Sequence, residues 1–149
     1  MTTLVASALL QASVLAAPGQ DYTTAVQESL ASGRPLVVLL GADWCPACKV
    51  MRDSTLPKVA QRGGLEKVEF AYVDVDRHPQ LTSQLSRGRS IPQLIRFEKK
   101  AGKWNARHLI GGHSVQKVKA FVNGEPEEKS PLQALPVSLG DWQRIISRK

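Results

Sequence analysis

Cysteine is scarce in this chain of 149 residues, which contains only Cys45 and Cys48. Two cysteines are too few for a disulfide-scaffold protein, and they cannot form a four-cysteine zinc site. The three histidines, His78, His108 and His113, are scattered, and none stands at metal-ligand spacing from the cysteine pair. We therefore expect neither a metal nor another cofactor.

Aromatic residues are also few, at 5% of the sequence, although the net charge is +7. A positive charge of this size can mark a protein that binds nucleic acid. Lysine and arginine are dispersed in short groups, however, and no basic run is interleaved with aromatic side chains that would stack on bases. A basic, solvated surface is the favoured interpretation, and nucleic-acid binding is not expected.

No apolar run is long enough to span a bilayer, and the segment from Leu4 to Ala17 is interrupted by polar residues. We therefore predict no integral membrane segment. The segment resembles the apolar part of a signal peptide, yet Met1-Thr2-Thr3 lacks the expected positive charge. A loose N-terminal helix is the alternative, and both interpretations stay open for residues 1–20.

The rest of the sequence predicts one globular α/β domain over residues 21–123. The expected order is helix, strand, helix, strand, helix, strand, strand, helix, which gives a mixed central sheet of about four strands flanked by helices on both faces. Predicted helices cover 22–32, 45–52, 57–64 and 79–86 and begin again after Ser114, and predicted strands cover 36–40, 68–75, 93–98 and 104–110.

Three local features complete this outline. The run Ser54-Thr55-Leu56-Pro57 is expected to interrupt the second helix, and residues 99–103 are expected to form a hairpin turn. Residues 124–149 read as a linker followed by a short amphipathic C-terminal extension that carries Trp142.

The two cysteines form a Cys-x-x-Cys pair directly after the apolar run of the first strand. Pro46 suits the first turn of a helix, where its missing N–H costs nothing. A thiol at a helix start faces unsatisfied N–H groups and the positive end of the helix dipole, which lower its pKa. We therefore predict that Cys45 attacks a substrate disulfide and that Cys48, one helical turn later, resolves the mixed disulfide.

The surrounding motifs resemble those of the thioredoxin-like family. The segments that carry the resemblance are Ala42-Asp43-Trp44-Cys45-Pro46-Ala47-Cys48-Lys49, Val73-Asp74-Val75-Asp76 and Arg89-Ser90-Ile91-Pro92. The first is closest to the thioredoxin-like domains of bacterial thiol–disulfide interchange proteins. Because those domains work largely outside the cytoplasm, the resemblance slightly favours an extracytoplasmic location, periplasmic or secreted.

The resemblance implies a thioredoxin-like protein-disulfide oxidoreductase. In that family the proline matching Pro92 is cis and faces the cysteine pair, so the Ile91 backbone would pair with a substrate chain, and Trp44 and Pro46 would add to the contact surface. Trp44 could equally be a core aromatic. The expected partners of this monomer are protein thiols and disulfides, together with an unidentified electron donor or acceptor.

The chain departs from the thioredoxin pattern at several positions. Leu39 occupies the position where thioredoxin has a buried acid, and Tyr72 occupies that of the lysine that pairs with the acid. Gln93 follows the loop proline, where threonine is common. Without the acid, no obvious side chain takes the proton of Cys48, although Asp43 or solvent could serve. We therefore expect slow resolution.

Two other functions stay open at this point. The domain could be a binding, scaffold or redox-sensing module without turnover, or a glutaredoxin-like enzyme, since Cys-Pro-x-Cys is also that family's spacing. Reduction, oxidation and isomerisation of disulfides all use the same two thiols, and the direction depends on the redox potential and on the electron donor.

Overall fold

A computed structural model of the chain describes residues 21–126. The predictions for residues 1–20 and for the C-terminal amphipathic extension lie outside the described residues. The chain forms the elements α1 (Tyr22–Ser32), β1 (Leu36–Gly41), α2 (Pro46–Val50), the π-helical turn η1 (Met51–Thr55), α3 (Leu56–Gln61), β2 (Glu69–Asp74), α4 (Pro79–Leu85), β3 (Gln93–Lys100), β4 (Lys103–Ile110) and α5 (Val115–Val122).

The four strands form one mixed sheet in the order β2-β1-β3-β4. β1 pairs parallel with β2 and antiparallel with β3, and β3 and β4 form an antiparallel hairpin. Every residue of β1 is buried, as expected for a continuous apolar strand covered on both faces. This arrangement confirms the predicted sheet and the predicted order of elements.

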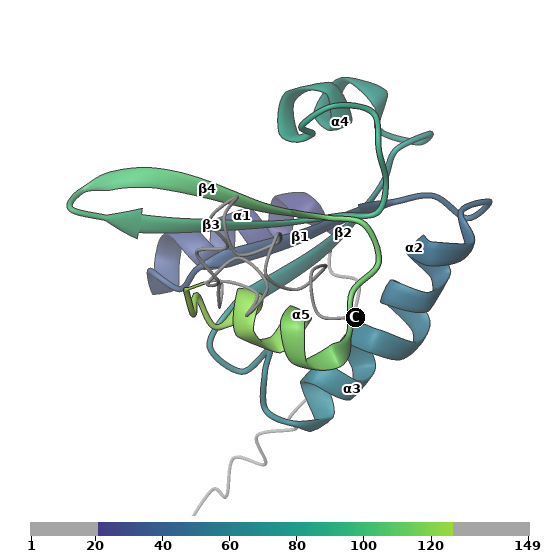
Figure 1. The fold of residues 1–149 in the computed structure, drawn as a ribbon. Helices are drawn as coiled ribbons and strands as arrows, with labels where there is room; N and C mark the ends of the chain where they lie inside the picture. The colour runs from purple at the N-terminus through teal and green to yellow at the C-terminus, as the bar shows by residue number, and fades with distance from the viewer. Residues whose placement is uncertain (1–20, 127–149) are drawn as a thin grey trace, which may run out of the picture.

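Helices cover both faces of the sheet (Figure 1). On one face, side chains of η1, α3 and α5 pack against alternate residues of β1, namely Val37 and Leu39. On the other face, α1 and α4 pack against Val38 and Leu40. The alternation follows from the two-residue period of a strand. The C-terminal end of β1, which lies between the two helical layers, leads directly into the loop that carries the cysteine pair.

The predicted interruption of the second helix is wrong, because the chain remains helical from Pro46 to Gln61. It passes through the π-helical turn η1, in which the Leu56 N–H donates to the carbonyl of Met51, five residues earlier. Pro57 has no N–H, and its ring would crowd the carbonyl four residues back in a regular α-helix. The wider turn immediately before Pro57 keeps the helix continuous.

The β3–β4 connection is tighter than the predicted turn over 99–103. Both strands extend further than expected, to Lys100 and from Lys103, and only Ala101 and Gly102 lie between them. These two residues have φ values of 49° and 77°. Positive φ at both positions is what a two-residue hairpin turn requires to match the twist of its strands.

Candidate active site

The cysteine pair lies at the start of α2. Cys45 is the N-cap residue and Pro46 is in the first turn, which agrees with the predicted helix start. Cys45 and Cys48 are joined by a disulfide, with their Cα atoms 5.2 Å apart, and the Cys48 N–H donates to Cys45 Sγ over 3.2 Å. The exposed fraction is 6% for Cys45 and 1% for Cys48, so Cys45 is the more accessible sulfur.

The loop before β3 brings Ile91 and Pro92 to the same place. Ile91 packs against the small buried cluster formed by Ala42, Cys45 and Cys48. The Ile91–Pro92 peptide bond is cis, and the Pro92 carbonyl accepts a hydrogen bond from the Gly111 N–H over 2.8 Å. Residues almost fifty positions apart in the sequence therefore meet at the disulfide.

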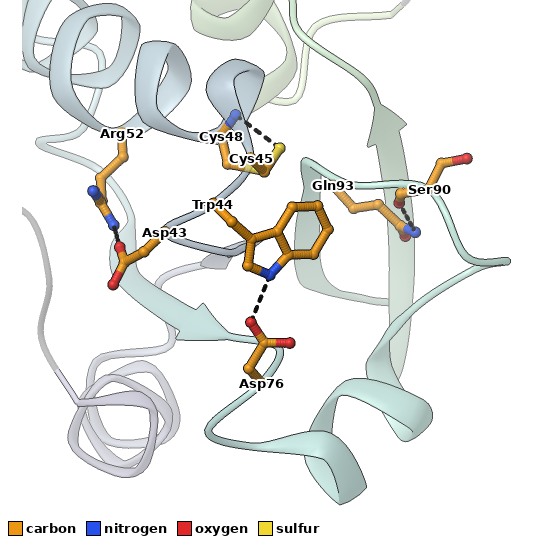
Figure 2. The surroundings of a disulfide bond; sticks show 8 residues. All are labelled: Asp43, Trp44, Cys45, Cys48, Arg52, Asp76, Ser90 and Gln93. Carbon is orange, nitrogen blue, oxygen red and sulfur yellow. Dashed lines mark hydrogen bonds and ion pairs between the residues drawn. A yellow bond between two sulfur atoms is a disulfide. The ribbon is translucent and has the colours of Figure 1, made fainter.

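Gln93 holds this loop from inside the protein. Its side chain is fully buried, its Oε1 accepts from the Arg87 N–H at 3.0 Å, and its Nε2 donates to the Arg87 carbonyl at 3.0 Å. The same Nε2 donates to the Ser90 carbonyl at 2.7 Å (Figure 2). The side-chain amide thus pairs with one N–H and two carbonyls of the loop backbone. A threonine side chain at this position would be too short to reach these groups. The sequence marked Gln93 only as a departure from the family pattern.

Replacing Gln93 by leucine is expected to lower the free energy of unfolding by about 1–3 kcal/mol, because loop polar groups lose their partners. The same change is expected to raise the KM for a protein disulfide, since the loop carries Ile91 beside the cysteines. Urea unfolding and steady-state kinetics measure both effects. Gln80→Leu, at an exposed position on α4, is the matched control. Equal stability of the two variants would contradict the role given to Gln93.

Trp44 lies on the surface, with an exposed fraction of 67%, so the core alternative is wrong. Its Nε1–H donates to Asp76 Oδ2 over 2.7 Å, and the indole points away from α2 toward the loop after β2 (Figure 2). Pro46 is exposed beside it. The two residues therefore form an open apolar rim next to Cys45.

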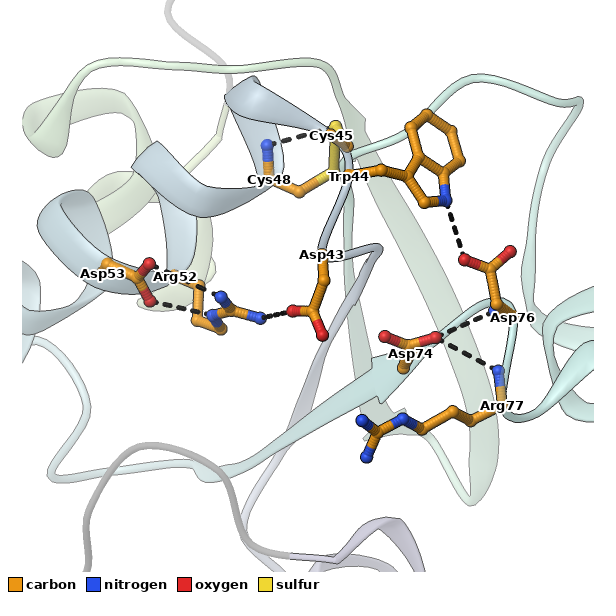
Figure 3. A network of polar contacts seen from close by, with 9 residues as sticks. All are labelled: Asp43, Trp44, Cys45, Cys48, Arg52, Asp53, Asp74, Asp76 and Arg77. Atoms are coloured by element: carbon orange, nitrogen blue, oxygen red, sulfur yellow. Dashed lines mark hydrogen bonds and ion pairs between the residues drawn. A yellow bond between two sulfur atoms is a disulfide. The ribbon is translucent and has the colours of Figure 1, made fainter.

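A second polar contact holds the residue before Trp44. Arg52 donates from Nη1 to Asp43 Oδ1 over 2.7 Å and from Nε to Asp53 Oδ1 over 2.8 Å (Figure 3). The hydrogen bond from Arg52 is the main cause that lowers the pKa of the Asp43 carboxyl. Asp43 is therefore a weak base, which makes it unsuited to take the proton of Cys48.

The floor of the site is formed by β1 and β2. Leu39 is fully buried in the core and lies opposite Tyr72 in the register of the two strands. Two residues further along β1, Gly41 passes directly beneath the disulfide. A Cβ atom at Gly41 would lie 3.1 Å from Cys48 Cβ and 3.2 Å from Tyr72 Cε2. Only glycine allows the strand, the cysteine and the tyrosine ring to approach this closely.

Replacing Gly41 by alanine is expected to lower the free energy of unfolding by about 1–2 kcal/mol, because the added methyl group overpacks a buried contact. Thermal or urea unfolding of the oxidised protein measures the loss. Gly112→Ala is the matched control, since a Cβ there would meet Ala47 at an ordinary 3.9 Å. If Gly41→Ala proved as stable as the control, the close approach would not be a constraint.

Two absences apply to the described part of the chain. Between residues 21 and 126, no group of three or more His, Cys, Asp or Glu side chains is arranged to hold a metal ion. Over the same residues, no helix has the length and apolar character needed to cross a membrane.

A disulfide-linked cysteine pair at a helix start, packed against the residue before a cis proline on a mixed α/β sheet, defines a thioredoxin-fold protein. The family model described as Thioredoxin matches residues 13–124, and the chain belongs to the thioredoxin family. A search of curated proteins gave no match.

Solved structures show the same fold. The chain is similar to a thioredoxin from Thermus thermophilus at 24% identity and a TM-score of 0.59, covering 69% of this chain and 82% of that one. Chloroplastic thioredoxin z is 27% identical with a TM-score of 0.53, and the match covers 66% of this chain and 85% of that one. Trxlp from Edwardsiella tarda EIB202 is 26% identical with a TM-score of 0.53, and the match covers 70% of this chain and 95% of that one.

Proposed function

We propose that this protein is a thiol–disulfide oxidoreductase that exchanges disulfides with protein substrates through Cys45 and Cys48. The observation that carries the proposal is the disulfide between these residues at the start of α2, with Ile91 packed against it. A thioredoxin domain with a Cys-x-x-Cys disulfide supports a protein-disulfide oxidoreductase of the thioredoxin type.

In the reductive direction, the reaction starts from the dithiol form. The Cys45 thiolate attacks one sulfur of a substrate disulfide, forms a mixed disulfide and releases the other substrate sulfur as a thiolate that takes a proton from water. The Cys48 thiolate then attacks Cys45 Sγ. The Cys45–Cys48 bond forms, the bond from Cys45 to the substrate breaks, and two electrons have passed to the substrate. The reverse sequence oxidises a substrate dithiol.

The surface around Cys45 supports a peptide as the substrate. Trp44 and Pro46 are exposed on one side of the sulfur, and Ile91 lies on the other with part of its side chain accessible. An extended chain in this position would use backbone pairing with Ile91 and apolar contact with Trp44. We propose these residues, together with Pro92, as the substrate-binding surface.

Reduction of insulin disulfides with dithiothreitol as the electron donor tests this function. The protein is expected to accelerate the reaction and, after equilibration in graded glutathione buffers, to change between dithiol and disulfide as a two-electron couple. The potential from that titration gives the favoured direction. Cysteines that stay oxidised across the series, with no effect on insulin, would contradict the proposal.

We further propose that the protein acts as a monomer outside the cytoplasm. The location is supported by the motif similarity to domains of thiol–disulfide interchange proteins and by the apolar segment between Leu4 and Ala17. Fusion of the full chain to a reporter enzyme that is active only after export tests the location. Size-exclusion chromatography with light scattering tests the oligomeric state.

A further inference from the structure

An apolar groove lies between α1 and the sheet, at the N-terminal end of β1. It encloses about 150 Å³, and its walls come from α1, β1 and the β3–β4 hairpin, chiefly Tyr22, Val26, Leu30, Leu36, Phe97 and Trp104. The serine in its wall, Ser29, already donates its hydroxyl to the Arg34 carbonyl. An apolar cavity of this size takes up a small aromatic ring. The groove therefore has room for an aromatic side chain from another segment.

Two apolar side chains of this groove are left uncovered by the residues that the structure describes. Leu30 has an exposed fraction of 62% and Trp104 one of 46%. Both belong to the same groove wall, so the exposed surface is continuous and not scattered over the domain. Contiguous apolar surface that faces water marks a place where something else binds.

The sequence of the C-terminal extension has the character of a segment that would cover this groove. Ser138 is followed three residues later by Asp141, which is the pattern of a capping box at the start of a helix. Beyond Ser138, large apolar residues recur at helical spacing, namely Leu139, Trp142, Ile145 and Ile146. The sequence therefore predicts a helix after Ser138 with Trp142 in its apolar stripe.

The described chain ends close to the edge strand that carries Trp104. α5 lies on the opposite face of the sheet from α1 (Figure 1), and after it the Glu125 carbonyl accepts from Arg107 Nη2 over 3.1 Å. β4 is an edge of the described sheet, and Trp104 precedes Arg107 by three residues, about 10 Å along the strand. Residues 126–137 reach up to about 40 Å when extended, so they can pass around this edge to the groove.

We propose that residues 138–149 dock in the groove between α1 and the β3–β4 hairpin of their own domain, with Trp142 inserted beside Trp104. The inference does not rest on the proposed function. The docked segment covers the exposed sides of Leu30 and Trp104. The groove lies at the start of β1, whereas the cysteine pair follows Gly41 at its other end. Docking therefore leaves the surface around Cys45 open.

Hydrogen exchange of the full chain, followed by mass spectrometry, tests the docking. Amides of residues 139–149 are expected to exchange at least about tenfold faster in Leu30→Lys than in the wild type, because the variant places a charge in the groove. Val50→Lys is the matched control, since Val50 is a similarly exposed apolar residue on α2 outside the groove, with an exposed fraction of 59%. It is expected to keep the wild-type exchange rates.

A second pair of variants tests the same contact from the side of the extension. Trp142→Ala is expected to give the same loss of protection as Leu30→Lys, and Gln143→Ala, beside it on the polar side of the stripe, is expected to give none. The amides of β1 and the rate of insulin reduction are expected to stay unchanged in all four variants, which separates release of the extension from unfolding.

Two results would overturn the inference. One is an extension that exchanges as fast in the wild type as in Trp142→Ala, or that keeps its protection in Leu30→Lys. The other is a different occupant of the groove. Leu30→Lys would then remove the protection of residues 4–17, or it would convert a dimer into a monomer in light scattering, without any change in residues 139–149.

Discussion

Replacing Cys45 by serine is expected to lower the rate of insulin reduction at least about a thousandfold, to the rate of the dithiol donor alone. The nucleophile in disulfide exchange is a thiolate, and a serine hydroxyl remains protonated at neutral pH and does not attack sulfur. Cys48 cannot take over the attack, because it is 1% exposed and is packed in a buried cluster with Ala42, Cys45 and Ile91. The turbidity assay for reduced insulin measures the loss.

Cys48→Ser is the matched control for this experiment. The variant keeps the accessible sulfur and is expected to attack a substrate once and then stop as a mixed disulfide, which non-reducing electrophoresis and mass spectrometry detect. The order of the two cysteines would be wrong if the mixed disulfide accumulated in Cys45→Ser and not in Cys48→Ser.

Replacing Leu39 by aspartate is expected to have two opposite effects. The side chain is fully buried among apolar residues, so a carboxyl group there should lower the free energy of unfolding by about 3–5 kcal/mol. Burial also raises the pKa of a carboxyl toward neutrality, where it becomes an effective base. Because residue 39 lies opposite Tyr72, whose ring and Cys48 both approach Gly41 two residues further along β1, the variant should resolve the mixed disulfide faster at neutral pH.

Single-turnover disulfide reduction and urea unfolding measure the two effects of Leu39→Asp. Leu39→Asn is the control, because it buries a polar group of the same size that cannot accept a proton. It is expected to be destabilised without any gain in rate. Equal rates for the wild type and Leu39→Asp in folded protein would show that proton removal from Cys48 does not limit resolution.

The sequence was sufficient for the fold and for the residues that meet at the disulfide. The apolar run 36–40, bounded by Pro35 and Gly41, suits a strand covered on both faces, and the motifs around Cys45 and Pro92 carried the family resemblance. The sequence did not predict the π-helical turn before Pro57. A proline that is incompatible with a regular α-helix can be accommodated either by ending the helix or by a local π-helical turn, and the residue pattern is the same in both cases.

Contacts that depend on the path of a loop were also beyond the sequence. The role of Gln93 follows from the positions of the Arg87 and Ser90 backbone groups, which no periodicity reports. The hydrogen bond from the exposed Trp44 indole joins it to Asp76, thirty-two residues later. The close approach of both Tyr72 and Cys48 to Gly41 required the strand register and the absence of a side chain at that position.

The side chains of Asp43 and Trp44 are hydrogen-bonded to two different parts of the fold. Asp43 accepts from Arg52 in η1, and Trp44 donates to Asp76 after β2. The loop ahead of Cys45 is therefore ordered before any substrate arrives, and little conformational entropy is lost when a peptide binds there. More of the binding free energy then remains for holding the two sulfurs in line, which speeds exchange with substrates that are themselves flexible or partly unfolded.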